Sequence, residues 1–229
     1  MMEKLFNLDS PWMRGLSKLA DLAVLNIVAL ICCIPVFTIG TSLTALHYVL
    51  LKMARDEEGK ILSAYFKSWK ENFRQATILW LIMLAVILVL AGDVMILRYT
   101  QLDFPAVLKV LMIAAVIFVY MVSCYIFPVL ARYENTIKNT VKNALLMSVL
   151  SLPKTILMMV LYLIPVIICL IPMLIPLVLF FGLSAPAYLA AKLYSGTFKR
   201  FEPEEAVCSG EMEEAGNEEV QDIKGELFR

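Results

Sequence analysis

Polar side chains that interrupt long apolar stretches are the residues of this chain that could do chemistry. Asp21 and Asn26 lie a little more than one helical turn apart, and Thr38, Thr41, Thr44 and His47 follow closely. Small polar residues inside a membrane join helices by hydrogen bonds worth about 1 kcal/mol each, so helix packing is the favoured interpretation. The alternative is a polar path, in which His47 relays protons because imidazole titrates near neutral pH.

A second pair of charged residues, Asp93 and Lys109, lies at similar distances from the turn around Gln101. A charge inside a membrane indicates a functional site by default. Both residues are expected close to the interface, however, where a lysine extends its amine to water. We therefore favour a structural ion pair across a hairpin over a transport site.

Signatures of catalysis and of metal binding are absent from the sequence. It contains no HExxH, GxSxG or Walker-type glycine loop, and the serines in its apolar runs have no nearby general base. A single histidine cannot form a multi-histidine metal centre, and no cysteine pair with ligand spacing surrounds it. The sequence therefore predicts neither an enzyme nor a bound cofactor or metal.

The composition indicates that these residues lie in a membrane. Hydrophobic residues make up 61% of the 229 residues, charged residues make up 17%, and the mean hydropathy is +0.79. A soluble globular domain is only about half apolar. We expect an all-α, polytopic transmembrane helical bundle whose surroundings are the lipid bilayer, and no binding of nucleic acid.

Long apolar runs predict about six membrane spans. The runs cover residues 16–40, 39–53, 76–97, 106–130, 155–172 and 174–194. The second run is short and contains several polar residues, so the sequence leaves open whether residues 39–53 span fully or form a re-entrant helix.

The basic residues predict how these runs cross the membrane. They precede the first run and fill the segment between residues 52 and 74, so the positive-inside rule places both segments in the cytoplasm. The chain must then turn back at the break formed by Pro35 and Gly40. We expect three hairpins with both termini in the cytoplasm, and no removable signal peptide because the first apolar region is too long.

Two cytoplasmic connectors have the pattern of amphipathic helices that lie in the membrane interface. In residues 61–73 the apolar and aromatic side chains share one stripe, and the basic side chains lie away from it. Residues 135–152 have a weaker stripe, formed by Ile137, Val141, Leu145 and Leu152. The stronger pattern predicts a helix that lies flat before the next span begins.

The end of the chain differs from the rest in charge. Residues 1–198 form the expected transmembrane domain, whereas residues 199–229 contain ten acidic and four basic residues. A segment this acidic buries too little apolar surface to offset the entropy of ordering, so we expect a disordered cytoplasmic tail. Four cysteines lie in apolar runs and one in this tail, and they predict no disulfide framework.

A scattered set of residues gives the chain a resemblance to a known family. These residues are Asn26, Pro35, Thr38, Gly40, Thr44, Ala45, Phe66, Asn72, Phe73 and Gln75. With them, and over most of its length apart from the tail, the chain resembles the YesL family of bacterial integral membrane proteins of unknown function. The resemblance implies a bacterial plasma membrane, no catalytic residues, and association with sugar uptake, since members are commonly encoded beside carbohydrate ABC transporters and their sensors.

Two functional hypotheses follow. The first is an accessory or regulatory membrane protein that binds an ABC transporter permease or a membrane sensor through its helices and its basic cytoplasmic face. The second is a small transporter or channel that has a polar path in the first hairpin and acts as a homo-oligomer. The polar sites that either function would use are Asp21, Asn26, Thr38, Gly40, Thr44, His47, Asn72, Asp93 and Lys109.

Overall fold

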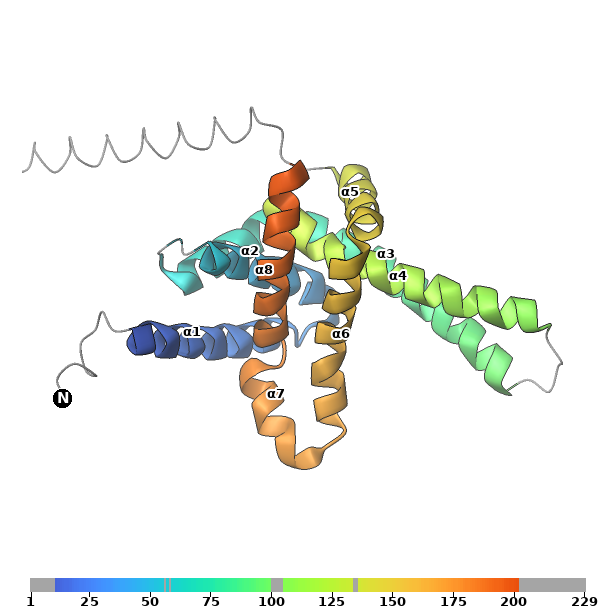
Figure 1. Cartoon of the computed structure of the whole chain (residues 1–229), viewed down its shortest axis with the longest axis horizontal. Helices are drawn as coiled ribbons and strands as arrows, with labels where there is room; N and C mark the ends of the chain where they lie inside the picture. Colours follow the sequence, from blue (N-terminus) through green and yellow to red (C-terminus); the bar gives the residue numbers. More distant parts are fainter. Residues whose placement is uncertain (1–10, 56, 58, 100–104, 134–135, 202–229) are drawn as a thin grey trace, which may run out of the picture. The chain divides into compact units, whose positions relative to one another are not determined.

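Helices form all the regular structure in the described part of the chain, which confirms the all-α prediction. The computed structural model describes residues 11–55, 57, 59–99, 105–133 and 136–201. In chain order the helices are α1 (Pro11–Cys32), η1 (Val36–Thr38), α2 (Ile39–Ala54), α3 (Ile61–Tyr99), α4 (Ala106–Arg132), α5 (Ile137–Leu150), α6 (Leu152–Cys169), η2 (Pro172–Leu174), α7 (Ile175–Phe181) and α8 (Ser184–Phe201) (Figure 1).

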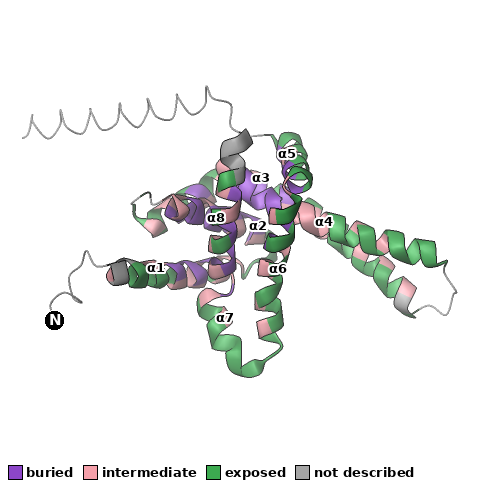
Figure 2. Cartoon of the chain, viewed as in Figure 1, coloured by how far each residue is buried: buried purple, intermediate pink, exposed green. Residues whose placement is uncertain are grey.

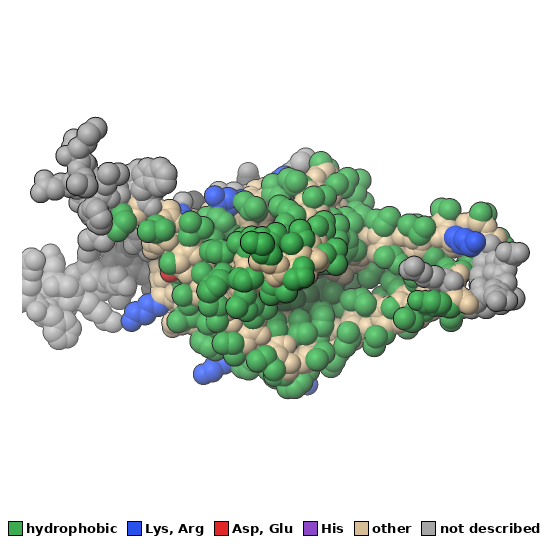
Figure 3. All heavy atoms as spheres, turned by 90° about the horizontal axis from the view of Figure 1, so that it is seen from below, with side chains coloured by type: hydrophobic (Ala, Val, Ile, Leu, Met, Phe, Trp, Pro, Cys, Tyr) green, Lys and Arg blue, Asp and Glu red, His purple; other side chains and the backbone are tan. Residues whose placement is uncertain are grey.

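Five to six helical segments are long and apolar enough to cross a membrane. Five segments qualify alone: Gly15–Cys32, Val36–Ala54, Ile61–Leu97, Ala106–Arg132 and Leu152–Cys169. A sixth consists of Pro172–Phe181 and Ser184–Gly196, which are bent by 51° relative to each other. Hydrophobic side chains cover most of the face seen in Figure 3, as expected for helices of a membrane protein.

The helix α2 forms the centre of the protein core. In the segment Val36–Ala54, 67% of the residues are buried inside the protein, against 11–22% for the other single-helix segments. It packs against both α3 and α4. Figure 2 shows the contrast with the outer ends of α3, α4, α6 and α7, where exposed residues predominate. The second apolar run therefore lies among helices, whatever its depth in a bilayer.

The connector predicted at residues 61–73 is not a separate helix. It continues without a break into the following span, so that α3 runs for 39 residues from Ile61 to Tyr99. Its apolar stripe is divided between two environments, because Tyr65 is fully buried in the protein while Leu62 and Phe66 are 43% and 45% exposed. The prediction of an independent helix was wrong, since its charged residues occupy one exposed face without interrupting the helix.

The second connector does form a helix of its own. It ends at Leu150, and Ser151 separates it from α6. Its buried face consists of Thr140, Ala144, Met147 and Ser148, whereas the predicted stripe of apolar residues faces outward. Small and polar side chains thus make the contact with the protein, which leaves the larger apolar side chains on the outside.

The chain divides into two units, Met1–Leu193 and Tyr194–Arg229. All the sites that follow lie in the first unit. The predicted acidic tail lies outside the described residues from position 202 onward.

Candidate functional site

Asn26 joins α1 to the break between α7 and α8. Its side chain is fully buried, and its Nδ2 donates to the carbonyl oxygens of Leu179 at 2.6 Å and Val178 at 3.3 Å. Its Oδ1 accepts from the backbone amides of Leu183 and Ser184 at 2.8 and 2.9 Å. One side chain therefore bonds to carbonyls at the end of α7 and to amides at the start of α8, where helix ends leave backbone groups in need of partners. The Val178 carbonyl also accepts from the Gly182 amide at 2.7 Å.

This contact explains how the last apolar segment tolerates a bend. Backbone groups freed by a break in a membrane helix must find other partners, because hydrocarbon supplies none. Gly182 occupies the break, and a Cβ there would lie 2.5 Å from Cγ1 of Val178. The bend, Gly182 and Asn26 thus form one structural unit. The role in helix packing that the sequence favoured for Asn26 corresponds to its hydrogen bonds with the ends of α7 and α8.

Hydroxyl groups of α2 make similar contacts with the neighbouring helices. Ser42 Oγ donates to the carbonyl of Ala29 in α1 at 2.9 Å and lies 2.8 Å from the hydroxyl of Tyr65 in α3. Thr41 Oγ1 donates to the carbonyl of Phe73 at 3.3 Å and lies 3.2 Å from Thr77 Oγ1. These hydroxyl groups hydrogen-bond α2 to α1 and to α3.

The break before α2 is fixed in the same way. Thr38 Oγ1 lies 2.7 Å from the carbonyl oxygens of both Cys32 and Pro35, so it closes the turn that follows α1. Gly40 then allows α2 to approach α3, because a Cβ at this position would lie 2.5 Å from Trp80 Cβ and 2.6 Å from the Ala76 carbonyl oxygen. At Gly40 the helices α2 and α3 therefore lie close together, as small residues allow in membrane proteins.

Three other predicted site residues form no hydrogen bond between helices within the described residues. Thr44 Oγ1 donates to the carbonyl of Gly40 at 2.8 Å, and Asn72 donates to Ser68, so both hydrogen-bond within their own helices. Asp21 is half-buried, and within the described residues it has no hydrogen bond or ion pair.

The expected ion pair between Asp93 and Lys109 is not formed. Salt bridges in the described ranges join Lys52 and Arg55 to Glu57 instead. Lys109 is exposed in the first turn of α4, whereas Asp93 is half-buried in α3. A lysine at the end of a span gains more by extending its amine to water than by pairing with a carboxylate on the neighbouring helix, which accounts for the difference.

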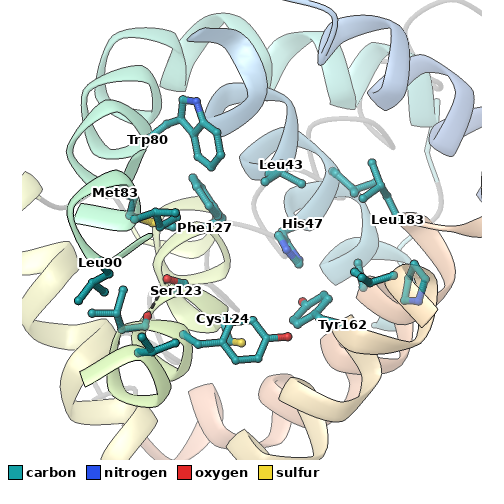
Figure 4. A pocket seen from close by; sticks show the side chains of 18 of the residues that line it. Leu43, His47, Trp80, Met83, Leu90, Ser123, Cys124, Phe127, Tyr162 and Leu183 are labelled. Atoms are coloured by element: carbon teal, nitrogen blue, oxygen red, sulfur yellow. Dashed lines mark hydrogen bonds between the residues drawn. The ribbon is translucent and has the colours of Figure 1, made fainter. Parts of the chain in front are cut away.

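The bundle contains an apolar cavity of about 650 Å³. Residues of α2, α3, α4, α6 and α8 line it, together with the break between α7 and α8 (Figure 4). The volume lies within the range of about 300–1,000 Å³ found for small-molecule sites. His47 is the predicted site residue that reaches this cavity, while Asn26 and Thr41 do not line it.

The few polar side chains in the cavity wall already have contacts within the protein. Tyr120 Oη donates to the Met159 carbonyl at 3.0 Å, and Ser123 Oγ donates to the Val119 carbonyl at 2.7 Å. The ring of His47 packs edge-on against that of Tyr162, with 6.3 Å between the centroids, and the two lie next to each other in Figure 4. The wall therefore presents an almost entirely apolar surface.

Two comparisons with known proteins found a match to this chain. Residues 22–94 match the family described as "Protein of unknown function, DUF624". Over 125 residues the chain is 28% identical to "Uncharacterized protein YesL" of Bacillus subtilis (strain 168). These two matches confirm the resemblance to the YesL family. No solved structure matches the chain.

The YesL-like match covers only part of each protein. It includes 54% of this chain and 58% of the length of the Bacillus subtilis relative. The family match runs from Leu22 in α1 through α2 to Val94 in α3, and therefore contains Asn26, Gly40 and Trp80. The matched segment thus contains Asn26, Thr41 and Ser42, whose side chains form hydrogen bonds between helices.

Several residues of the site were not among the sequence-based predictions. Trp80 Nε1 donates to the Val36 carbonyl at 2.7 Å, and its ring lies 6.3 Å from that of Phe127. Thr155 Oγ1 bonds to the carbonyls of Ser148 and Ser151 and to Tyr125, and so joins α6 to α5 and α4. Within apolar runs such aromatic and hydroxyl residues resemble ordinary packing residues. The one available signal was that tryptophan and tyrosine usually bring a polar group that needs a partner.

Metal binding finds no support in the structure. Among the residues that the structure describes, no group of three histidine, cysteine, aspartate or glutamate side chains could hold a metal ion.

Proposed function

We propose that this chain is an accessory or regulatory membrane protein that acts by binding a partner membrane protein, without catalysis. The observation that supports this most is the use of its polar side chains. Asn26, Thr41 and Ser42 are buried and bonded to backbone or to other side chains of neighbouring helices. Residues bonded in this way stabilise a shape, and a fixed shape is what a partner recognises.

The same observation disfavours a polar path for solutes through the first hairpin. A hydrophilic solute needs side chains that exchange their hydrogen bonds with it during passage. Buried groups that already have good partners lose them only at a cost of about 1–3 kcal/mol each. The transporter hypothesis therefore lacks the side chains that it requires in this hairpin.

A basic strip at the start of α3 is the surface that we propose for the partner. The strip consists of Lys60, directly before the helix, and of Lys67, Lys70 and Arg74 within it, all of which are exposed. By the positive-inside rule it lies in the cytoplasm, where both termini are also proposed to lie. An acidic cytoplasmic segment of a transporter permease or a membrane sensor has the charge that complements it.

The role in carbohydrate uptake is a narrower proposal, based on the resemblance to the YesL family. It places the protein in a bacterial plasma membrane beside a carbohydrate ABC transporter. Co-purification from native membranes in mild detergent, followed by mass spectrometry of the bound proteins, tests both the partner and its class. We expect a permease or sensor subunit in the purified complex, and slower sugar uptake after deletion of the gene. Recovery of the protein alone, with sugar uptake unchanged, would contradict the proposal.

Charge reversal on the basic strip sharpens this experiment. The double substitution Lys67→Glu with Lys70→Glu is expected to remove the partner from the purified complex. The matched control is Lys138→Glu with Lys142→Glu, which makes the same charge change at exposed positions of α5. The control is expected to retain the partner; equal retention by both variants would exclude the strip as the binding surface.

A further inference from the structure

The apolar cavity has a neighbour that extends it toward the end of the α3–α4 hairpin. A second cavity of about 380 Å³ is lined by residues of α3 and α4 and reaches Lys109. Val94 and Val116 line both cavities, so the two are adjacent. We propose that together they hold one acyl chain of a membrane phospholipid, with the phosphate of its head group at Lys109.

Exposure along the first cavity shows from where such a chain would enter. At the end shared with the second cavity, Val94 and Val116 are 44% and 40% exposed. At the opposite end, near α2, Leu46 is fully buried and His47 and Cys124 are 5% and 6% exposed. The cavity therefore has a closed inner end and an open, aliphatic mouth at the shared end, and it is also open along its side, where Ile87 and Val166 are 41% and 60% exposed. If these helices cross a membrane, as proposed above, the mouth opens to lipid.

The chemistry of the wall favours a hydrocarbon over a polar ligand. The hydroxyls of Tyr120 and Ser123 already donate to backbone carbonyls, and the other polar rings of the wall, those of His47 and Tyr162, pack against each other. A sugar or an ion would replace few of its bonds to water here, at a cost of several kcal/mol for each polar group left without a bond. A hydrocarbon chain has no hydrogen bonds to lose on entry, and it fills space that otherwise lacks contacts.

The dimensions of the two cavities also fit a lipid chain. From Lys109 to Tyr120 the helix α4 rises by about 17 Å, at 1.5 Å for each of 11 residues. One leaflet of the hydrocarbon core is about 15 Å thick, or half of roughly 30 Å. A chain whose head group lies beside Lys109 thus ends near Tyr120, which lines the first cavity.

Lys109 supplies the charge that a phosphate group requires. It is exposed at the start of α4, lines the second cavity, and makes no ion pair within the described residues. Asp93 lies beside Val94 in α3 but does not pair with Lys109. A lysine at the end of a span extends its amine to the interface, which is where the phosphate of a phospholipid lies.

Photocrosslinking with a phospholipid that carries a diazirine at the end of one acyl chain tests the proposal. The purified protein is reconstituted with this lipid, irradiated and mapped by peptide mass spectrometry. We expect label on buried residues of the inner end, such as Leu46 and Cys124, as well as on the exposed faces of the helices. Label confined to the exposed faces, or a cavity occupied by a segment of a second copy or of another protein, would overturn the proposal.

A pair of tryptophan substitutions on α4 provides the matched control. Val116→Trp fills the passage between the two cavities and is expected to remove the label from Leu46 and Cys124. Val110→Trp places the same side chain on the same helix at a position that is 65% exposed and lines neither cavity. It is expected to leave the inner label unchanged; equal loss in both variants would contradict the proposed route. The map of labelled residues in the unsubstituted protein shows whether an acyl chain reaches the inner end of the cavity even if Val116→Trp does not fold.

A final arm tests the head group. Lys109→Gln is expected to lower labelling of the inner end by the phospholipid about fivefold, and to leave labelling by a diacylglycerol with the same chains unchanged. Equal labelling of Lys109→Gln and the unsubstituted protein by the phospholipid would remove Lys109 from the site. These results do not depend on the partner protein, so they separate this proposal from the one above.

Discussion

Asn26 supplies hydrogen-bond partners to four backbone groups at the break between α7 and α8. An amide is the side chain that suits this position, because it donates and accepts at once. A carboxylate could accept from the amides of α8 but could not donate to Leu179. A hydroxyl would be too short to reach both helix ends. The requirement for asparagine follows from the geometry of the break.

Substitution of this residue is expected to destabilise the protein. Asn26→Ala removes four contacts, and at roughly 0.6 kcal/mol for a hydrogen bond inside a membrane protein the loss is about 2 kcal/mol. Thermal unfolding in detergent measures it as a lower Tm. Asn139→Ala, at an exposed position of α5, is the control and is expected to leave the Tm unchanged. Equal Tm values for Asn26→Ala and the control would show that the contacts with the break do not stabilise the fold.

Which polar residues matter could be predicted from the sequence, but not their partners. Asn26 was singled out because it interrupts an apolar run, and packing was the favoured interpretation. Its partners lie more than 150 positions along the chain, and nothing local to either segment links them. The ion pair between Asp93 and Lys109 was predicted from their equal distances to a turn. Those distances say nothing about which way each side chain extends.

At the level of helices, α3 shows why hydropathy alone misplaces an element boundary. Its charged residues, among them Lys67 and Lys70, lower the local hydropathy and suggested a separate helix at the interface. They occupy only the exposed face of the helix. Tyr65 and Ser68 on another face are buried, and Tyr65 meets Ser42 of α2. The helix therefore continues through the charged region because protein contacts support it.

The close approach of α2 to α3 depends on Gly40. In Gly40→Ala the new Cβ would meet the backbone at Ala76 and the Cβ of Trp80, neither of which can move without separating the helices. We expect the free energy of unfolding to fall by about 1–3 kcal/mol, as at other overpacked sites. A lower Tm in detergent measures this loss. Gly92→Ala is the control on α3, because a Cβ there has no atom within 4 Å. Alanine favours helix over glycine, so the control should be neutral or slightly stabilising. A Gly40→Ala protein as stable as this control would show that the helices tolerate separation.

For the whole molecule, the number of spans could be predicted from the sequence and their arrangement could not. Length and hydropathy predict about six spans, and the structure has five to six suitable segments. The central position of α2 and the cavity beside it depend on contacts among helices that no single apolar run reveals. The hairpin topology and the cytoplasmic termini still depend on the placement of basic residues.

Cysteine accessibility in intact cells tests that topology. In a chain whose native cysteines are replaced by alanine, Lys60→Cys should be protected from an impermeant label until the cells are permeabilised. Ala106→Cys, at the start of α4, should be labelled in intact cells. Both positions are exposed, so burial in the protein does not protect either one. The reverse pattern of labelling would invert the proposed topology.

Solute flux is the measurement that best separates a binding protein from a transporter. Purified protein with an intact Tm is reconstituted in liposomes and assayed for uptake of sugars, inorganic ions and protons. Because Asn26, Thr41 and Ser42 hold helices together and the cavity wall is apolar, we expect no flux above that of protein-free liposomes. Flux of any of these solutes that is lost on substitution of His47 would contradict the proposed role.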